Sequence, residues 1–141
     1  MRYAPAVPPE SDVDRANREL VERFFDAADR GDMATLEAIV DDDMVMEWPQ
    51  SGERFRGREN VFGAMAAVAV KPQIAAPPRI TGAGNVWVFM APLLYGEDLQ
   101  HYVAVLELAD GRIKRGTGYW GRPFDAQDAR APYLDRDPDP R

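Results

Sequence analysis

With 141 residues, 45% of them hydrophobic and 10% aromatic, the chain has the size and composition of one globular domain. Its 17 basic and 24 acidic side chains give a net charge of −7 without a basic stripe, so we expect no nucleic-acid partner. The lack of cysteine excludes disulfides and thiolate chemistry, and a single histidine excludes a multi-histidine metal site. No apolar run is long enough to cross a membrane and no signal peptide is recognisable, so we expect no membrane partner and a cytoplasmic location.

Two helices are predicted at the start of the domain. Residues 1–10 contain three prolines and are expected to form a flexible arm. Ser11 or Asp12 can cap a first helix, which Gly31 ends as a C′ glycine, and Asp32 can cap a second. Apolar residues fall at helical spacing in both: Val13, Ala16, Leu20, Phe24 and Ala28 in the first, and Met33, Leu36, Ile39 and Val40 in the second.

A strand, a third helix and a series of strands follow. We expect a strand over Met44–Trp48, a helix over Glu59–Ala69 with Val61, Phe62, Met65 and Val68 inward, and strands near residues 79–82, 86–95, 99–108 and 112–120. The last two strands join at Asp110-Gly111, a dipeptide typical of type I′ hairpin turns. Helices first and antiparallel strands afterwards indicate an α+β fold. We assign residues 11–134 to this single domain, the last part being a strap from Asp125, and expect residues 135–141 to be disordered.

Three segments in this order resemble the SnoaL-like and ketosteroid-isomerase-like proteins of the nuclear transport factor 2-like superfamily. They are ANRELVERFFDAADRGDMATLEAIVDDDMVMEWP, FRGRENVFGAM and LELADGRIKRGTGYWGRPFDAQDARAPY. The resemblance implies a cone in which three N-terminal helices pack on the concave face of a curved antiparallel (mixed) sheet, around one small-molecule pocket. It also implies a homodimer formed through the outer face of the sheet.

The polar groups of the ketosteroid isomerases are missing from the matching positions. Those enzymes use an Asp base on the first strand and an oxyanion hole made by a Tyr and a protonated Asp. Here Trp48 stands at the position of the base, Phe24 at that of the tyrosine and Val103 at that of the second aspartate. Strand alternation points Glu47 to the opposite face, so it enters the pocket only if the strand is bulged. The resemblance therefore does not imply that isomerase mechanism.

His101 and Glu47 are the candidate catalytic residues. Histidine titrates near neutral pH, and alternation places His101 with Leu99, Val103 and Val105 on the expected cavity face, where it could act as a general acid or base. The alternative is a structural histidine bonded to backbone. The consecutive residues Asp41, Asp42 and Asp43 cannot easily face one ion, so we expect no metal site, and we expect no cofactor.

Aromatic and methionine side chains suggest an apolar pocket for a flat, hydrophobic ligand. The residues expected to line it are Phe24, Met46, Trp48, Phe62, Met65, Trp87, Val103 and Trp120; each one alone could equally belong to the core. Gly116 and Gly118 leave space on one face of the last strand, either for a ligand or for a bend. Arg54, Arg56 and Arg58 could meet a ligand carboxylate or lie in a solvated loop.

Two functions remain open at this point. The first is a cofactor-independent cyclase, isomerase or dehydratase of secondary metabolism, acting on a hydrophobic aromatic or polycyclic substrate by acid/base chemistry. The second is a non-catalytic binding or carrier protein for an apolar ligand, which the loss of the isomerase-type polar groups favours. A partner-binding adaptor is a third, weaker possibility, since no exposed apolar stripe stands out in the sequence.

Overall fold

The computed structural model describes residues 9–136. The predicted arm over residues 1–10 and the predicted disordered end over residues 135–141 therefore fall largely outside the described residues. The helices are α1 (Asp12–Arg30), α2 (Met33–Ile39) and α3 (Arg58–Ala66), with a 3₁₀ helix η1 (Asp128–Tyr133). The strands are β1 (Val40–Trp48), β2 (Glu53–Arg56), β3 (Gln73–Ile74), β4 (Arg79–Ala83), β5 (Val86–Tyr95), β6 (Asp98–Ala109) and β7 (Arg112–Gly121). Within these residues, no helix is long and apolar enough to cross a membrane.

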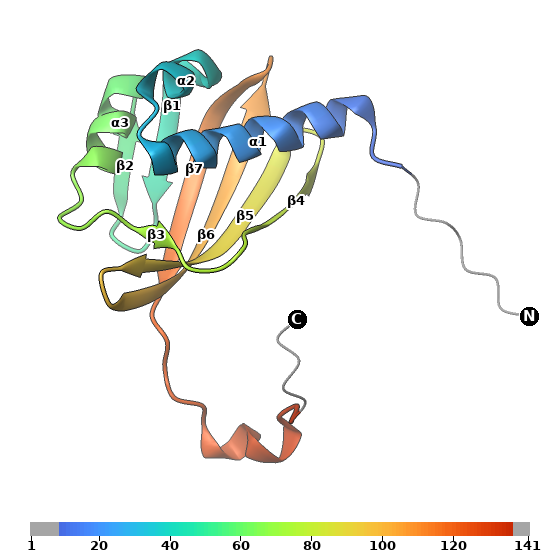
Figure 1. Cartoon of the computed structure of the whole chain (residues 1–141), viewed down its shortest axis with the longest axis vertical. Helices are drawn as coiled ribbons and strands as arrows, with labels where there is room; N and C mark the ends of the chain where they lie inside the picture. The colour runs from blue at the N-terminus through green and yellow to red at the C-terminus, as the bar shows by residue number, and fades with distance from the viewer. Residues whose placement is uncertain (1–8, 137–141) are drawn as a thin grey trace, which may run out of the picture.

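The strands form one open, curved sheet in the order β2-β1-β7-β6-β5-β3, with β4 also paired to β5. The β1–β7 pair is parallel and the others are antiparallel, so the sheet is mixed. The long helix α1 crosses the concave face of this sheet, and α2 and α3 lie at its β1–β2 end (Figure 1). The predicted α+β cone is confirmed.

The caps confirm both predicted ends of α1 and the predicted start of α2, whereas α3 ends at Ala66 and not at the predicted Ala69. The Ser11 side chain accepts a hydrogen bond from the Asp14 backbone N–H at 3.1 Å, and Gly31 ends α1 in the left-handed conformation. Asp32 accepts a bond from the Thr35 backbone N–H at 3.1 Å and so begins α2. These local bonds satisfy backbone groups that a helix leaves unpaired at its ends.

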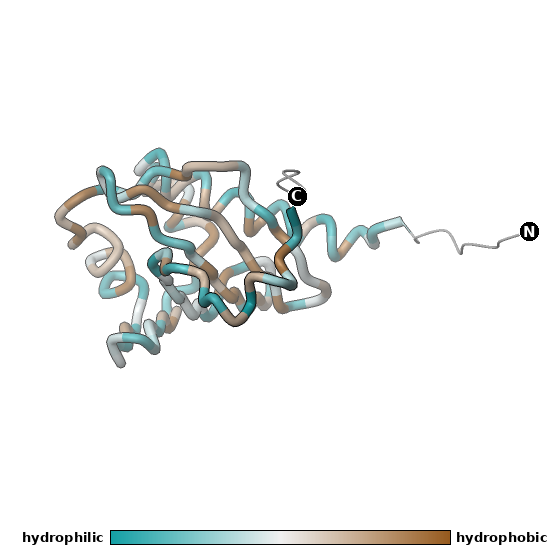
Figure 2. The backbone as a smooth tube through the Cα atoms, turned by 90° about the horizontal axis from the view of Figure 1, so that it is seen from below, coloured by the Kyte–Doolittle hydropathy of each residue, from teal (hydrophilic) through white to brown (hydrophobic). Residues whose placement is uncertain are grey.

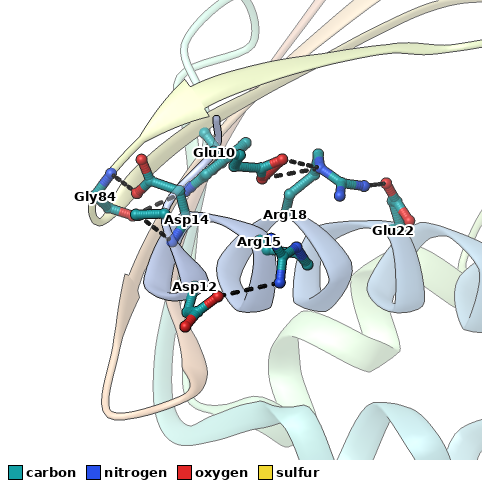
Figure 3. A network of polar contacts seen from close by, with 9 residues as sticks. Glu10, Asp12, Asp14, Arg15, Arg18, Glu22 and Gly84 are labelled. Carbon is teal, nitrogen blue, oxygen red and sulfur yellow. Dashed lines mark hydrogen bonds and ion pairs between the residues drawn. The ribbon is translucent and has the colours of Figure 1, made fainter. Parts of the chain in front are cut away.

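The N-terminal turns of α1 are attached to the β4–β5 turn at Gly84. The Asp14 carboxylate accepts a hydrogen bond from the Gly84 N–H at 2.8 Å (Figure 3), and the Asn17 amide donates to the Gly84 carbonyl at 2.7 Å. The Trp87 indole N–H donates to the same carbonyl at 2.8 Å. The helix is thereby fixed across the open end of the sheet.

The core lies between the helices and the concave side of the sheet. Hydrophobic and polar stretches alternate along the chain (Figure 2). Among the described residues, all the buried core side chains are hydrophobic, including Phe24, Leu36, Val61, Trp87 and Leu106. The inward position predicted for Val68 is wrong, because 41% of its surface is exposed and α3 ends before it.

The β6–β7 hairpin contains a one-residue β-bulge near its turn. Asp110 and Gly111 both have positive φ, at 54° and 71°, as a type I′ turn requires. Next to the turn Leu108 pairs with Ile113, but the following pair is Glu107 with Arg115, so Lys114 is the extra residue. Side chains alternate between the two faces of a sheet. This single extra residue therefore reverses the face on which every later residue of β7 lies, whereas the alternation of β6 is unbroken.

Beyond β7 the chain leaves the sheet as an extended strap, residues 122–136, that ends in η1 (Figure 1). All the residues of this strap are exposed. Phe124 and Tyr133 have 86% of their surface accessible and Leu134 has 53%.

Candidate ligand site

The concave side of the sheet carries apolar and aromatic side chains on all its long strands. Burial and register place the following residues there: Met44, Met46 and Trp48 of β1, Trp87, Phe89, Ala91, Leu93 and Tyr95 of β5, Tyr102, Ala104, Leu106 and Leu108 of β6, and Gly116, Gly118 and Trp120 of β7. None of these positions holds a carboxylate or a histidine, but the same face continues at the start of β6 with Gln100 and the exposed Asp98, which pair with Leu93 and Tyr95. The two tyrosines are the only inward side chains in this set that carry a hydroxyl group.

Five rings, each from a different strand, form a partly buried aromatic cluster, defined here as Trp48, Phe55, Tyr95, Tyr102 and Trp120. The Trp48 ring meets Phe55 edge to face at a centroid distance of 4.7 Å and Trp120 at 5.4 Å. Trp120 in turn lies 5.0 Å from Tyr102. Such offset and edge-to-face contacts are the favoured geometries of aromatic pairs.

The interior end of the cluster rests on two stacked phenylalanines. The rings of Phe25 and Phe89 are parallel within 16° at 3.7 Å. Tyr102 lies 6.4 Å from Phe25 and 6.1 Å from Phe89. The cluster is therefore continuous with the core at this end and partly exposed at the other.

The two phenol groups supply the polarity of the cluster. The Trp120 indole N–H donates a hydrogen bond to the Tyr95 hydroxyl oxygen at 2.8 Å, which leaves the Tyr95 O–H free to donate. Burial raises the pKa of Tyr95, partly offset by that hydrogen bond. Burial also raises the pKa of Tyr102 well above that of an ordinary phenol, and the charge of an ionised Tyr95 would raise it further. Both groups are therefore protonated donors at neutral pH.

Most of the predicted pocket residues do come together in the structure, but several of them are core. Phe24, Met46 and Trp87 are buried, with exposed fractions of 4%, 8% and 3%. Trp48, Phe62 and Met65 are partly buried against the same hydrophobic cluster. Trp48 and Trp120 meet directly. The role of these residues in lining a ligand pocket stays a prediction.

The predicted placement of His101 and Val103 on the cavity face is wrong. The bulge at Lys114 pairs Tyr102, not His101, with Trp120, so Tyr102 shares the concave side and His101 lies on the outer face. His101 is exposed there, and Val103 is partly exposed beside it. In a hairpin without the bulge, counting from the turn would have paired His101 with Trp120.

Glu47 also lies on the outer face, between Met46 and Trp48 of β1. Its carboxylate forms an ion pair with Arg115 and lies 3.9 Å from the Arg54 guanidinium. The irregular part of β1 falls between Val40 and Val45, before Glu47, so it does not turn this side chain inward. The expectation that a bulge could bring Glu47 into the pocket is not met.

The first two of the three consecutive aspartates form ion pairs with different residues. Asp41 pairs with Lys114 at 2.6 Å and Asp42 with Arg58 at 2.8 Å. The Asp43 backbone N–H donates to the Asp41 carboxylate at 2.9 Å. Hydrogen bonds from Lys114 and from Asp43 hold the pKa of Asp41 below its usual range.

Tyr95 and Tyr102 were not among the predicted site residues. Both faces of β6 are apolar, so alternation alone does not say which face is inward. Opposite Trp120, an aromatic residue is the expected partner, since aromatic pairs are favoured across strands. That pairing signal would have pointed to Tyr102.

A groove of about 400 Å³ adjoins the aromatic cluster between β2 and α3. Its lining residues are Arg54, Phe55, Arg56, Glu59, Asn60, Gly63, Ala64 and Ala67. Phe55 belongs to both the groove and the cluster. A second groove, of about 300 Å³, lies near the start of α3 and is lined by Asp42, Gly57, Arg58, Glu59 and Asn60.

Residues 21–116 match the family model of the SnoaL-like domain. This chain belongs to the SnoaL-like family. None of the curated protein sequences matches it. Among solved structures, the SnoaL-like chain is similar to a nuclear transport factor 2-like protein of unknown function from Burkholderia xenovorans LB400. The identity is 30%, the TM-score is 0.76, and the match covers 87% of this chain and 96% of that one.

Two further structures share the fold of this SnoaL-like chain. One is described as a candidate ketosteroid isomerase from Kribbella flavida, with 23% identity, a TM-score of 0.80, and coverage of 89% of this chain and 92% of that one. The other is described as a candidate SnoaL-like polyketide cyclase from Jannaschia sp. CCS1, with 18% identity, a TM-score of 0.71, and coverage of 81% and 91%. At these identities the likeness concerns the fold alone.

Proposed function

We propose that this SnoaL-like protein binds a flat, hydrophobic small molecule at the aromatic cluster and donates hydrogen bonds to one of its oxygen atoms from Tyr102 and Tyr95. The observation that carries the proposal is the pair of protonated phenols, Tyr95 and Tyr102, packed among aromatic rings on the concave face. Stacking rings favour a planar ligand, and buried O–H donors favour an acceptor such as a carbonyl oxygen.

The same donors can support chemistry. A carbonyl gains negative charge when an adjacent proton leaves, and donors fixed in a dry site stabilise that charge more than water does. The candidate reactions are those of a cofactor-independent cyclase, isomerase or dehydratase, as the descriptions of the two distant relatives suggest. Carriage of the ligand without conversion is the alternative, supported by the lack of a buried carboxylate or histidine among the described residues.

Binding is tested with 2-acetonaphthone, a flat aromatic ketone, by titration against the intrinsic tryptophan fluorescence. We expect saturable quenching, and Tyr102→Phe should weaken the affinity by about threefold to tenfold because one net hydrogen bond is lost. His101→Ala, on the outer face, is the matched control and should bind as the wild type does. No saturable binding, or an equal effect of both substitutions, would contradict the proposal.

Native mass spectrometry distinguishes an enzyme from a carrier. A ligand that co-purifies with the protein is released, identified by mass, and incubated with fresh protein. Conversion that Tyr102→Phe slows and His101→Ala leaves unchanged supports an enzyme. Recovery of the ligand unaltered after prolonged incubation supports a carrier.

We also propose a homodimer formed through the outer face of the sheet. Val88, Met90, Leu94, Val103 and Val105 give this face an apolar centre that is only partly buried within one chain. Burial of such a patch against a second copy removes apolar surface from water. Light scattering after size exclusion should give twice the chain mass. Val103→Glu should shift the protein to monomer, whereas Val13→Glu, at an exposed valine of α1, should leave the dimer intact.

A further inference from the structure

We infer that Asp98 accepts a hydrogen bond from a hydroxyl group of the ligand, so that the substrate class is a flat aromatic ketone with a hydroxyl at its far end. The inference rests on the proposed ligand site at the aromatic cluster and adds a second anchoring point to it. It starts from three polar side chains, Asp98, Gln100 and Arg122, which contact one another at the end of the cluster away from the core.

The strand pairing places these polar groups on the concave side, next to the phenols. Asp98 pairs with Tyr95 across the β5–β6 hairpin, and paired residues of two strands point to the same face. Along β6, Gln100 lies between Asp98 and Tyr102, and residues two apart in a strand share a face. Arg122 directly follows β7, and its guanidinium reaches this row of side chains at Asp98.

The Asp98 carboxylate is held through only one of its two oxygen atoms. The Gln100 amide donates a hydrogen bond to Oδ2 at 3.0 Å, and the Arg122 guanidinium donates to the same Oδ2 at 3.2 Å. Among the residues that the structure describes, none donates a hydrogen bond to Oδ1. The Asp98 side chain is 43% exposed, so a ligand can reach this atom. Two donors thus fix the carboxylate and leave one acceptor oxygen for a ligand.

The ion pair with Arg122 determines which kind of donor fits. The guanidinium already balances the charge of Asp98, so a ligand ammonium would have to compete with it for the carboxylate. A hydroxyl group brings no charge and needs only Oδ1. A hydrogen bond from a hydroxyl to a carboxylate is stronger than one between two neutral groups. The site therefore favours a neutral O–H donor over an amine.

The spacing along β6 sets the length of the ligand. Asp98 and Tyr102 are four residues apart, which is roughly 13 Å along a strand. A hydrogen bond of about 2.7 Å at each end leaves roughly 8 Å between the two oxygen atoms of the ligand. Two fused aromatic rings with a ketone at one end and a hydroxyl at the other cover this distance.

The electrostatics of Tyr95 agree with one continuous site. Burial is the main cause that raises the pKa of the Tyr95 hydroxyl, and the charge of Asp98 raises it further, against the lowering effect of the Trp120 hydrogen bond. The carboxylate is therefore close enough to act on the phenol. Donors for the ketone and an acceptor for the hydroxyl lie side by side at the same end of the sheet.

The test compares 6-hydroxy-2-acetonaphthone with 6-methoxy-2-acetonaphthone, which has the same rings and ketone but no O–H donor. Titration calorimetry at about pH 6 keeps the probe hydroxyl neutral, since an ordinary phenol has a pKa of about 10. We expect the wild type to bind the hydroxyl probe at least about tenfold more tightly, the effect of one hydrogen bond to a charged group. Unsubstituted 2-acetonaphthone should bind as the methoxy probe does, which excludes a steric penalty of the methyl group.

Asp98→Ala should lower the affinity for the hydroxyl probe to that of the methoxy probe. Glu97→Ala is the matched control, because Glu97 is an exposed acid in the β5–β6 turn, next to Asp98 in the chain. This variant should keep the wild-type preference for the hydroxyl probe.

The outcomes separate this inference from the proposed function. If the wild type binds all three probes equally, or if Asp98→Ala keeps the preference, Asp98 does not recognise the hydroxyl and the aromatic site stands without it. If Asp98→Ala weakens the hydroxyl and methoxy probes by the same factor, the effect is not specific to the hydroxyl and the inference is overturned. If no probe binds to the wild type, the proposed function itself fails, and the inference fails with it.

Discussion

The Trp120 indole connects three parts of the aromatic cluster. It contacts the rings of Trp48 and Tyr102 and donates to the Tyr95 hydroxyl. Its position also explains Gly118, since an added Cβ there would lie 3.1 Å from the Trp120 ring. Trp120 therefore holds the rings of the aromatic cluster together and fills the space beside Gly118.

Trp120→Phe is expected to lower the free energy of unfolding by about 1–3 kcal/mol, because it removes ring contacts and a hydrogen bond together. Urea unfolding followed by circular dichroism measures the change without relying on tryptophan emission. Tyr119→Phe, at the exposed neighbouring position on the outer face, should change stability by much less. Equal effects of the two substitutions would contradict the assigned role of Trp120.

Asp41 and Lys114 give the stability a defined dependence on pH. The pKa of Asp41 is lowered in the folded chain, chiefly by the Lys114 hydrogen bond. Its contribution is therefore present above the unfolded pKa, about 3.9, and is lost as the pH falls through the folded value. Asp41→Asn should destabilise the protein at pH 7, and the difference from the wild type should shrink below about pH 4. Urea midpoints measured between pH 7 and pH 2.5 check this, and a difference that stays constant would contradict it.

Two glycines in regular elements are predicted to respond in opposite ways to alanine. At Gly82 of β4, an added Cβ would lie 2.8 Å from the Trp87 Cα and would also contact the Val86 carbonyl oxygen. Gly82→Ala should therefore destabilise the protein by about 1–3 kcal/mol through overpacking. Gly63 of α3 has open space around it, so Gly63→Ala should stabilise by about 0.5–1 kcal/mol through helix propensity. Thermal unfolding of both variants measures whether each substitution lowers or raises the stability.

At the scale of elements, patterns of residues predicted the three helices and five of the seven strands in their chain order, but not the short strands β2 and β3. Caps at Ser11, Gly31 and Asp32 and the Asp110-Gly111 turn are local chemistry, so they are visible in the sequence. The side on which β6 presents each residue is harder to predict, because both faces of this strand are apolar. Burial of Leu108, Leu106 and Ala104 against the core places Tyr102 inward and His101 outward. This is why the aromatic residues of the site were predicted in part and His101 was placed on the wrong face.

At the scale of the whole molecule, the strap and the outer sheet face are two exposed apolar surfaces on one chain. Phe124 and Tyr133 each expose 86% of their surface, which is unfavourable unless a partner covers them. We expect the strap to contribute to the proposed dimer. A chain that ends at Gly121 should dimerise more weakly than the full chain in analytical ultracentrifugation. Its far-UV circular dichroism spectrum should show that the domain remains folded. An unchanged dissociation constant would show that the strap takes no part.

The bulge at Lys114 shifts the pairing of β7 with β6 by one residue. Every residue of β7 beyond it keeps its identity but changes the side on which it is presented, so one inserted residue decides that Gly116, Gly118 and Trp120 face the concave side. Comparison of relatives residue by residue along this strand is therefore meaningful only after the bulge has been located in each. A relative that lacks it would present its own equivalents of Thr117 and Tyr119 to the interior, and the same cone would then offer different chemistry.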